Sequence, residues 1–326
     1  MIHDSPASLV FGEHFLSLKT IAPHFSVNLK LEGLSISGSI KIKSALHMLT
    51  EMEKSGQLRP GMRVIESSSG NLGLALSMLC AIKGYPFVCI SDPNISRQTA
   101  GQIKAFGAEL IIVQRRDENG GYLQTRIDLI RTMLQQDARL LWINQYENTL
   151  NVDAHYQMTG PEILSQFARP DYLFVGAGTT GTLGGVSRYV REQSPSTVIV
   201  AVDSVGSVTF GHPPGKRLIP GLGTSSPPPI RAHAHFDQLL MIEERDSLRM
   251  CHDLAAQGVM LGGSSGTVLC AVRQYAPHIP KDACVVAISP DMGDRYIDTL
   301  YNPDWIQQHF QGRPECLADI APTLSN

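Results

Sequence analysis

Short apolar runs rich in β-branched residues alternate with longer segments of helical periodicity from residue 63 onward. The runs RVIES (63–67), FVCIS (87–91), ELIIV (109–113) and LLWIN (140–144) each precede such a segment, and YLFVGAG, TVIVAVDS and ACVVAIS follow later. Strands that are apolar throughout and separated by helices are typical of parallel sheets covered on both faces. The pattern therefore predicts an α/β fold.

The length of the chain and one irregular segment add to this picture. With 326 residues the chain is long enough for two lobes rather than one compact domain. The tract from Gly211 to Pro229 is rich in proline and glycine and is the one long irregular segment. Loops of that length are uncommon and usually serve as lids or surface excursions.

Composition narrows the classes of function. Hydrophobic residues make up 43% of the chain and charged residues 17%, which indicates an ordinary folded protein. The formal net charge of -3 argues against a nucleic-acid partner, because such proteins usually carry a basic face. No apolar run is long enough to cross a bilayer, and the opening MIHDSPASLV lacks the features of a signal peptide. Six scattered cysteines without a CxxC pair are typical of a reduced, cytoplasmic protein.

The segment VGAGTTGTLGG (175–185) follows a predicted strand and precedes a predicted helix. Gly176, Gly178 and Gly181 form a GxGxxG pattern, and Asp203 lies 22 residues beyond the last glycine, as in a dinucleotide-binding fingerprint. The same backbone N–H groups, with three threonine hydroxyls, could instead hold a single phosphate, and a plain tight turn is the third interpretation. The motif alone does not distinguish a dinucleotide from a lone phosphate.

Two further glycine- and serine-rich segments also open predicted helices. ESSSGNLG (66–73) places many hydrogen-bond donors at one helix N-terminus, which suits a carboxylate or a cofactor hydroxyl. A simple N-cap needs only one serine, so the surplus favours a ligand over a cap. GGSSGT (262–267), taken alone, is an ordinary turn with an N-cap.

Four charged or ionisable residues outside these segments are also candidates. Lys41, in SGSIKIKSA, has by itself the expectation of any surface lysine. Arg126 follows two glycines near the carboxyl edge of the predicted sheet, where it could clamp a carboxylate or phosphate with two hydrogen bonds. His233 and His235 alternate but have no third ligand at metal-binding spacing, so a polar loop is favoured and no metal site is predicted.

Taken in order, these segments resemble the fold-type II pyridoxal-phosphate (PLP) enzymes of the cysteine synthase group, over most of residues 30–302. SSGNLG is similar to that family's TSGNTG, MTGPEI to TTGPEI, GTTGT to GTGGT, GGSSGT to GISSGA and MGDRY to SGERY. The resemblance implies a tryptophan synthase β-like fold of two α/β lobes with mostly parallel sheets. Residues 38–146 would form a small lobe with the Schiff-base lysine and the substrate loop. Residues 1–37 and 147–326 would form a large lobe with the phosphate cradle.

The resemblance assigns cofactor contacts to individual residues. Lys41 corresponds to the catalytic lysine that forms a Schiff base with PLP, and Asn71 to the residue that binds the ring hydroxyl. Ser264 corresponds to the residue that faces the pyridine nitrogen. A serine hydroxyl does not protonate this nitrogen as a carboxylic acid would. Loss of a β-substituent is then favoured over transamination. The residues expected to hold the cofactor phosphate are Gly178, Thr179, Thr180, Gly181 and Thr182.

Substrate contacts follow from the same resemblance. The residues expected to bind the substrate carboxylate are Ser68, Ser69, Gly70 and Gln145. Arg126 and Tyr146 match positions used for substrate recognition in the branch that makes N-(2-amino-2-carboxyethyl)-L-glutamate. Within the group, GGYLQTRI (120–127), WINQYEN (142–148) and GDRYIDTLY (293–301) are most similar to this branch.

This branch implies a transferase that replaces the phosphate of O-phospho-L-serine with the amine of L-glutamate. The product would serve 2,3-diaminopropionate biosynthesis for a siderophore or antibiotic, and the family implies a homodimer. The alternative is a cysteine or cyanoalanine synthase that uses O-acetyl- or O-phosphoserine. A dinucleotide enzyme and a catalytically inactive homologue remain as further alternatives.

The chain also departs from its relatives at defined positions. Ile42 and Lys43 replace the Asp-Arg pair that usually follows the lysine, and Lys43 is predicted to be a structural substitute rather than a second catalyst. Gly178 stands where the glutamate-using branch has a serine, which leaves both phosphate and acetate open as the leaving group. Leu72 replaces a threonine of the cysteine synthase loop and counts against a plain cysteine synthase.

Overall fold

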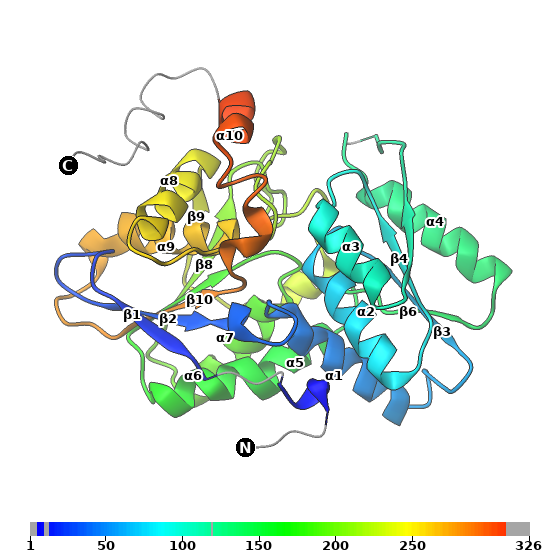
Figure 1. Cartoon of the computed structure of the whole chain (residues 1–326). Helices are drawn as coiled ribbons and strands as arrows, with labels where there is room; N and C mark the ends of the chain where they lie inside the picture. Colours follow the sequence, from blue (N-terminus) through cyan, green and yellow to red (C-terminus); the bar gives the residue numbers. More distant parts are fainter. Residues whose placement is uncertain (1–4, 10–12, 119, 311–326) are drawn as a thin grey trace.

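The computed structural model describes residues 5–9, 13–118 and 120–310, and these residues form two sheets that lie side by side (Figure 1). The strands of the six-stranded sheet are, in sheet order, β1 (Phe15–Leu18), β2 (Val27–Leu31), β10 (Val285–Ser289), β7 (Tyr172–Gly176), β8 (Val198–Ser204) and β9 (Gln238–Ile242). The strands of the four-stranded sheet are β5 (Glu109–Ile112), β4 (Phe87–Ser91), β3 (Arg63–Ser67) and β6 (Leu140–Trp142).

Neighbouring strands pair in parallel throughout the described residues, except for the antiparallel pair β1–β2 at one edge. The predicted α/β fold with mostly parallel sheets is thereby confirmed. The last strand, β10, lies between β2 and β7, with Val285 opposite both Val27 and Tyr172. The strands of the smaller sheet all come from residues 63–142, inside the predicted small lobe, whose limits at 38 and 146 stay a prediction.

Helices connect the strands and cover the sheets. Their bounds are α1 (Lys41–Lys54), α2 (Asn71–Lys83), α3 (Arg97–Ala105), α4 (Leu123–Gln136), α5 (Leu150–Ala154), α6 (Gly160–Gln166), α7 (Gly181–Gln193), α8 (Glu244–Ala255), α9 (Gly263–Tyr275) and α10 (Pro303–Phe310). Local chemistry sets several ends: the side chain of Ser96 caps α3 by accepting from Thr99 N, and α2 ends at Gly84, whose φ of 77° suits glycine. A π-helical turn, His155–Thr159, interrupts the path from α5 to α6.

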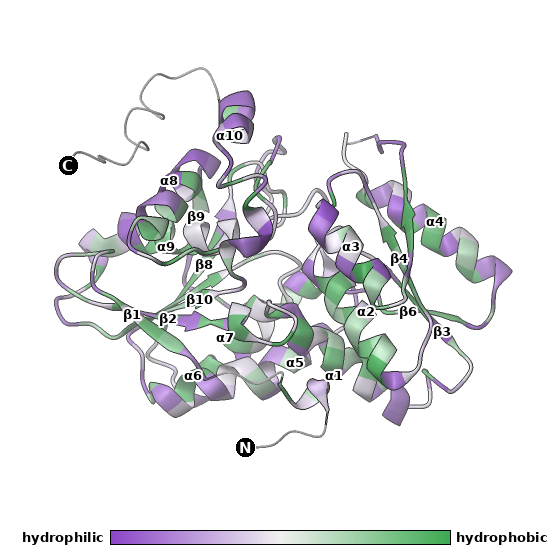
Figure 2. Ribbon diagram, in the orientation of Figure 1, coloured by the Kyte–Doolittle hydropathy of each residue, from purple (hydrophilic) through white to green (hydrophobic). Residues whose placement is uncertain are grey.

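Each sheet has its own hydrophobic core. The larger sheet packs against α9 through a cluster that includes Leu29, Phe174 and Leu269, and the smaller sheet packs against α1 and α2 through one that includes Met48 and Leu76. Both β4 and β10 are buried at every position, which explains why their sequences are apolar throughout. Figure 2 shows hydrophobic positions concentrated on the strands, while the outer helix α4 alternates between hydrophilic and hydrophobic positions.

The proline- and glycine-rich tract, except for its last residue Pro229, lies in an irregular segment, residues 205–228, that packs against the start of α7 and α9. Gly223 N donates to the carbonyl of Ala177 at 2.8 Å. A Cβ added at Gly221 would lie 3.0 Å from the Cβ of Ser264, so this glycine allows the close approach of the two segments. The irregular segment is therefore a wall of the region that holds the candidate cofactor residues.

Two further observations bear on the class of protein. No helix in the described part of the chain has the length and apolar character needed to span a membrane. The cysteines at positions 80, 89, 251, 270 and 284 are free thiols, and Cys316 lies outside the described residues.

Candidate active site

Lys41 is the first residue of α1 and follows a tightly held segment. The preceding Ile40 donates its N–H to the carbonyl of Pro290 at 2.8 Å, and Ser39 forms an isolated bridge with Asp291. The Lys41 side chain is half-buried, and this burial lowers the pKa of its amine to about 8. A substantial share of Lys41 is therefore uncharged just above neutral pH, as a nucleophilic amine requires.

The start of α7 forms a cradle from Gly178 to Thr182. A Cβ at Gly178 would lie 2.9 Å from the carbonyl oxygen of Gly221, and one at Gly181 would collide with the side chain of Asn151. Thr180 has a φ of 70°, a left-handed conformation that is strained for threonine. Its hydroxyl is buried and has no hydrogen-bond partner among the described residues. Because buried polar groups normally have partners, this hydroxyl and the helix N-terminus fit a bound anion.

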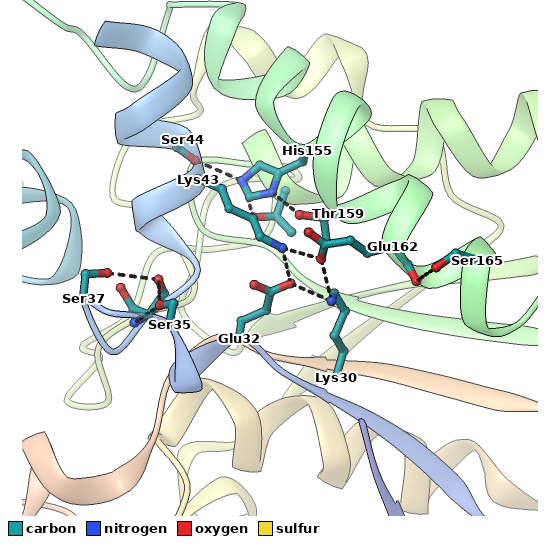
Figure 3. A network of polar contacts seen from close by, with 12 residues as sticks. Lys30, Glu32, Ser35, Ser37, Lys43, Ser44, His155, Thr159, Glu162 and Ser165 are labelled. Atoms are coloured by element: carbon teal, nitrogen blue, oxygen red, sulfur yellow. Dashed lines mark hydrogen bonds and ion pairs between the residues drawn. The ribbon is translucent and has the colours of Figure 1, made fainter. Parts of the chain in front are cut away.

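His155 connects the lysine helix to this cradle. Its Nε2 lies 2.9 Å from the hydroxyl of Ser44, one turn beyond Lys41, and 3.2 Å from the hydroxyl of Thr182. Its Nδ1 lies 2.9 Å from the hydroxyl of Thr159 in the same π-helical turn (Figure 3). Burial and the nearby charge of Lys41 hold the pKa of His155 well below its usual value, so the imidazole is neutral.

Lys43 points away from this arrangement into a buried charged cluster, which we define as Lys30, Glu32, Lys43 and Glu162 (Figure 3). Lys43 Nζ lies 2.9 Å from Glu32 Oε1 and 2.6 Å from Glu162 Oε2. Lys30 Nζ lies 3.4 Å and 2.6 Å from the same two oxygens. The two lysines balance the two glutamates, and the contacts of Lys43 agree with its predicted structural role.

The loop before α2 holds the serines singled out in the sequence. Ser68 Oγ accepts from Gly70 N at 3.2 Å and from Gly73 N at 3.0 Å, so this hydroxyl caps the helix. Ser69 and Gly70 are half-buried. Gln145 lies beside the same loop, because its side-chain amide donates to Ser67 O at 3.1 Å. The structure thus brings Gln145 together with the serine loop.

Glu66, which the sequence analysis did not single out, holds this pair of segments together. One carboxylate oxygen accepts from Ser67 N at 2.6 Å and Trp142 Nε1 at 3.2 Å, and the other accepts from Gln145 N at 3.1 Å. Glu66 is fully buried, and burial raises the pKa of its carboxyl from 4.5 to about 7 despite these donors.

Asn71 and Ser264 each lie in the first turn of a helix, α2 and α9, and both helices meet the segment around Asp291. Asn71 Nδ2 donates to Asp291 Oδ2 at 2.7 Å. The carbonyl of Asp291 accepts from Gly262 N at 3.2 Å and from the hydroxyl of Ser265 at 3.3 Å. The structure therefore brings the lysine segment, Asn71 and Ser264 to one place through Asp291.

Arg126 and Tyr146 lie on the side of the small sheet. Arg126 is buried on α4, its Nη1 lies 3.3 Å from Asp92 Oδ2, and its Nε has no partner among the described residues. Burial raises the pKa of Tyr146, while the positive charges of Arg126 and Arg217 oppose that rise. Arg217, from the irregular segment, is thus a second guanidinium in this region that the sequence analysis missed.

The structure also bears on the alternating histidines and on the segment MGDRY. Within residues 5–9, 13–118 and 120–310, no three His, Cys, Asp or Glu side chains lie close enough together to hold a metal ion. His233 lies in a short 3-10 turn, Pro229–His233, beside Gly184 of α7. The segment MGDRY was noted in the sequence, but its contacts with Asn71 carried no local signal.

The chain is similar to a family of known proteins and to several solved structures. The family described as "Pyridoxal-phosphate dependent enzyme" matches residues 12–291. The chain is 39% identical over 279 residues to the N-(2-amino-2-carboxyethyl)-L-glutamate synthase of Ralstonia nicotianae, which covers 85% of this chain and 82% of that protein. Among solved structures it is similar to an O-ureido-L-serine synthase (TM-score 0.84, 29% identity, 97% of this chain and 98% of that one). It is also similar to O-acetylserine sulfhydrylase isoform 3 of Entamoeba histolytica (TM-score 0.84, 27% identity, 92% of each chain).

Proposed function

Because the chain belongs to the pyridoxal-phosphate dependent enzyme family, we propose that it catalyses a β-replacement on an activated L-serine, with the amine of L-glutamate as the incoming group. O-phospho-L-serine is the preferred donor, and the product is N-(2-amino-2-carboxyethyl)-L-glutamate. The observation that carries this proposal is the 39% identity over 279 residues with a synthase named for that product. The enzyme would act as a cytoplasmic homodimer and supply 2,3-diaminopropionate for a siderophore or antibiotic.

The residues present fit the cofactor of this fold-type II family. The cradle at the start of α7 offers backbone N–H groups and the unpartnered, buried hydroxyl of Thr180 for the phosphate. The half-buried amine of Lys41 is suited to covalent attachment, since burial lowers its pKa to about 8. Asn71 would bind the ring hydroxyl, and Ser264 would meet the ring nitrogen. When bound, the cofactor supplies the electron sink that the side chains lack.

Lys41 would have two roles in the reaction. Its amine would hold the cofactor until an amino-acid substrate binds. The same amine would then remove the proton from the substrate Cα as a general base. Loss of the β-substituent follows, and Lys41 returns the proton to Cα after the second substrate has added. The lowered pKa of Lys41 suits both directions of this transfer.

The serine loop would bind the carboxylate of the donor amino acid. The backbone N–H of Ser69 and the side-chain amide of Gln145 are suited to this, because they lie at the N-terminus of α2, where the helix dipole favours a negative charge. The Gly70 N–H, which donates to Ser68 Oγ at 3.2 Å, would share this hydrogen with the carboxylate. Ser68 uses its hydroxyl to cap the helix and donates its N–H to Ile90 O at 2.9 Å, so its contribution would be to hold the loop that presents Ser69.

Arg126 and Tyr146 would recognise the carboxylates of the second substrate. A guanidinium has five N–H donors, and the contact with Asp92 uses only part of them. The buried Nε of Arg126 therefore leaves donor capacity for a carboxylate. An inorganic nucleophile such as sulfide has no carboxylate for this pair to bind, which favours an amino-acid nucleophile.

The proposed small lobe, residues 38–146, would close over the site once the donor is bound. Water must be kept away from the reactive β-carbon, because hydrolysis would compete with the second substrate. The irregular segment 205–228, which packs against Ser264 and the cradle, would form the fixed wall against which the lobe closes.

The decisive test measures product formation from paired substrates. Purified enzyme is incubated with O-phospho-L-serine or O-acetyl-L-serine and with L-glutamate, sulfide or cyanide, and products are identified by mass spectrometry. We expect phosphate release from O-phospho-L-serine that depends on added L-glutamate. Release that proceeds with sulfide and not with glutamate would overturn the proposed nucleophile.

A cysteine synthase activity is the second candidate. The structural likeness to the O-acetylserine sulfhydrylase of Entamoeba histolytica favours it. The substitution Arg126→Met separates the two functions. A glutamate-dependent activity should fall steeply because a carboxylate contact is lost, whereas a sulfide-dependent activity should change little.

A further inference from the structure

The guanidinium of Arg295 joins two segments that are far apart in the sequence. Arg295 lies in a 3-10 turn, Gly293–Tyr296, shortly after β10. Its Nη1 donates to the side-chain oxygen of Asn71, at the start of α2. Its Nη2 donates to the backbone carbonyl of Ser37, four residues before Lys41. One rigid, planar group therefore contacts both the segment that carries Lys41 and the residue proposed to bind the cofactor ring.

Gly38 is shaped to receive this guanidinium. It adopts a φ of 71°, in the left-handed region, and this conformation turns the Ser37 carbonyl toward Arg295. A Cβ added at Gly38 would collide with Arg295 Nη2. The segment SGSIKIKSA thus contains a glycine for two reasons, its backbone conformation and the space that Arg295 needs.

Asp291 completes the orientation of the Asn71 amide. Its Oδ2 accepts from Asn71 Nδ2 at 2.7 Å and from the Tyr296 hydroxyl at 2.5 Å. Arginine can only donate, so the Asn71 atom facing Arg295 must be the oxygen, and the amide nitrogen must face Asp291. The amide is thereby fixed in one of its two flipped orientations. A primary amide has a second N–H, which remains to reach an acceptor in the site.

We propose that Arg295 is a positioning residue, which sets the spacing between the Lys41 segment and Asn71 so that both meet the same cofactor ring. The inference deepens the proposed function and rests on its assignment of Lys41 and Asn71. Arginine suits this task better than lysine, because its two terminal nitrogens are held at a fixed separation and its charge persists at every working pH. A lysine has one nitrogen and would reach only one of the two acceptors.

The test uses the bound cofactor as the reporter. Apoprotein variants Arg295→Met and Arg295→Lys are titrated with PLP without any amino acid, and the dissociation constant and absorption spectrum are recorded across a pH series. We expect the dissociation constant of both variants to rise about tenfold or more, equivalent to about 1.4 kcal/mol. The band near ~410 nm should also titrate at a different pH, because the Asn71 N–H no longer meets the ring oxygen.

Three controls separate positioning from stability. Arg191→Met removes another partly buried arginine, paired with Asp237 at 2.5 Å, and is expected to lower Tm without changing the spectrum. Tyr296→Phe leaves both Arg295 contacts in place and removes only the hydroxyl donor to Asp291, so its effect on the dissociation constant and the spectrum should be smaller than that of Arg295→Met. Gly38→Ala displaces the guanidinium from the opposite side and should reproduce the spectral change, which provides an answer if Arg295→Met does not fold.

Two results would overturn the inference. One is an unchanged spectrum and affinity in Arg295→Lys and Gly38→Ala. The other is an equal spectral change in Arg191→Met, which would reduce Arg295 to a general stabilising contact. Because no amino-acid substrate is present, these results do not depend on glutamate being the nucleophile. A normal cofactor spectrum without glutamate-dependent turnover would instead contradict the proposed function alone.

Discussion

The buried charged cluster of Lys30, Glu32, Lys43 and Glu162 offers a quantitative test of why a lysine follows the catalytic position. The substitution Lys43→Met keeps the approximate volume and the flexible stem but removes the ammonium group. Lys43 is fully buried and lies within 2.9 Å of both carboxylates, so its loss leaves two glutamates opposite one lysine. The protein then holds an unbalanced negative charge in its interior.

The cost follows from the geometry. Removing one partner of a buried, hydrogen-bonded ion pair costs about 3–5 kcal/mol, because the remaining charge stays desolvated. A protein of this size loses about 2 °C of Tm for each kcal/mol, so Tm is expected to fall by about 6–10 °C. Adding Glu162→Gln restores neutrality with Lys30 and Glu32 still paired. The double variant should be less destabilised than the sum of the single variants by about 1–3 kcal/mol.

The assay is thermal unfolding of the apoprotein, combined with the absorption spectrum of the holoenzyme. Lys54→Met is the matched control, since Lys54 lies on the same helix and pairs with Glu51 at 2.7 Å but leaves 66% of its side chain exposed. Exposed pairs contribute little, so its Tm should stay within about 1 °C of the unaltered protein. A Tm for Lys43→Met as high as that of Lys54→Met would refute the reasoning, as would strictly additive losses in the double variant.

Lys41→Ala should remove the Schiff-base absorbance near ~410 nm, which borohydride abolishes in the unaltered protein. Lys43→Ala should retain this absorbance, because the Lys43 ammonium is bound by two carboxylates and does not form the Schiff base. Burial lowers the pKa of Lys41 to about 8, so capture of PLP by the apoprotein should accelerate with rising pH and reach half its maximum near pH 8; a pH-independent rate would contradict this. Thr180→Gly removes the backbone strain of a threonine in the left-handed conformation, so the free energy of unfolding of the apoprotein should rise by about 1 kcal/mol and its Tm should increase. PLP binding should weaken, because the threonine hydroxyl is lost. Burial raises the pKa of the Glu66 carboxyl from 4.5 to about 7 in the folded protein. As pH rises between these two values, the carboxyl loses its proton in the unfolded chain before it does so in the folded protein. The free energy of unfolding therefore falls by up to about 3 kcal/mol over this pH range. Glu66→Gln should flatten this part of the stability–pH curve in urea unfolding, and an unchanged slope would refute the assignment.

Sequence periodicity predicts all four strands of the smaller sheet but only part of the larger sheet. The runs that form β3, β4, β5 and β6 are predicted because each is apolar along its length and followed by a helical pattern. The strands β1, β2 and β9 are not predicted from the sequence. In β1 and β2 (FLSL and VNLKL) polar residues interrupt the apolar ones, and β9 is exposed or half-buried at most of its positions. The π-helical turn before α6 is likewise invisible, since its spacing differs from that of an α-helix by one residue per turn.

The residues of the candidate site likewise differ in how far the sequence predicts them. Lys41, the cradle and Ser264 come from glycine- and serine-rich segments whose local chemistry marks the start of a helix. The contacts of Asp291 and Arg295 with Asn71 join residues more than 200 positions apart, so no local pattern encodes them. Burial is equally hidden from the sequence, and it is burial that shifts the pKa of Glu66.

The position of β10 between β2 and β7 has a consequence for the order in which the protein forms. Val285 pairs with Val27 on one side and with Tyr172 on the other, so the centre of the larger sheet stays open until the last strand has left the ribosome. The smaller sheet, built from a continuous stretch of chain, can fold earlier because its contacts are closer in sequence. Arg295, a few residues beyond β10, leaves the ribosome only after this strand. Nascent chains released before β10 should thus contain an ordered small sheet and remain unable to retain PLP.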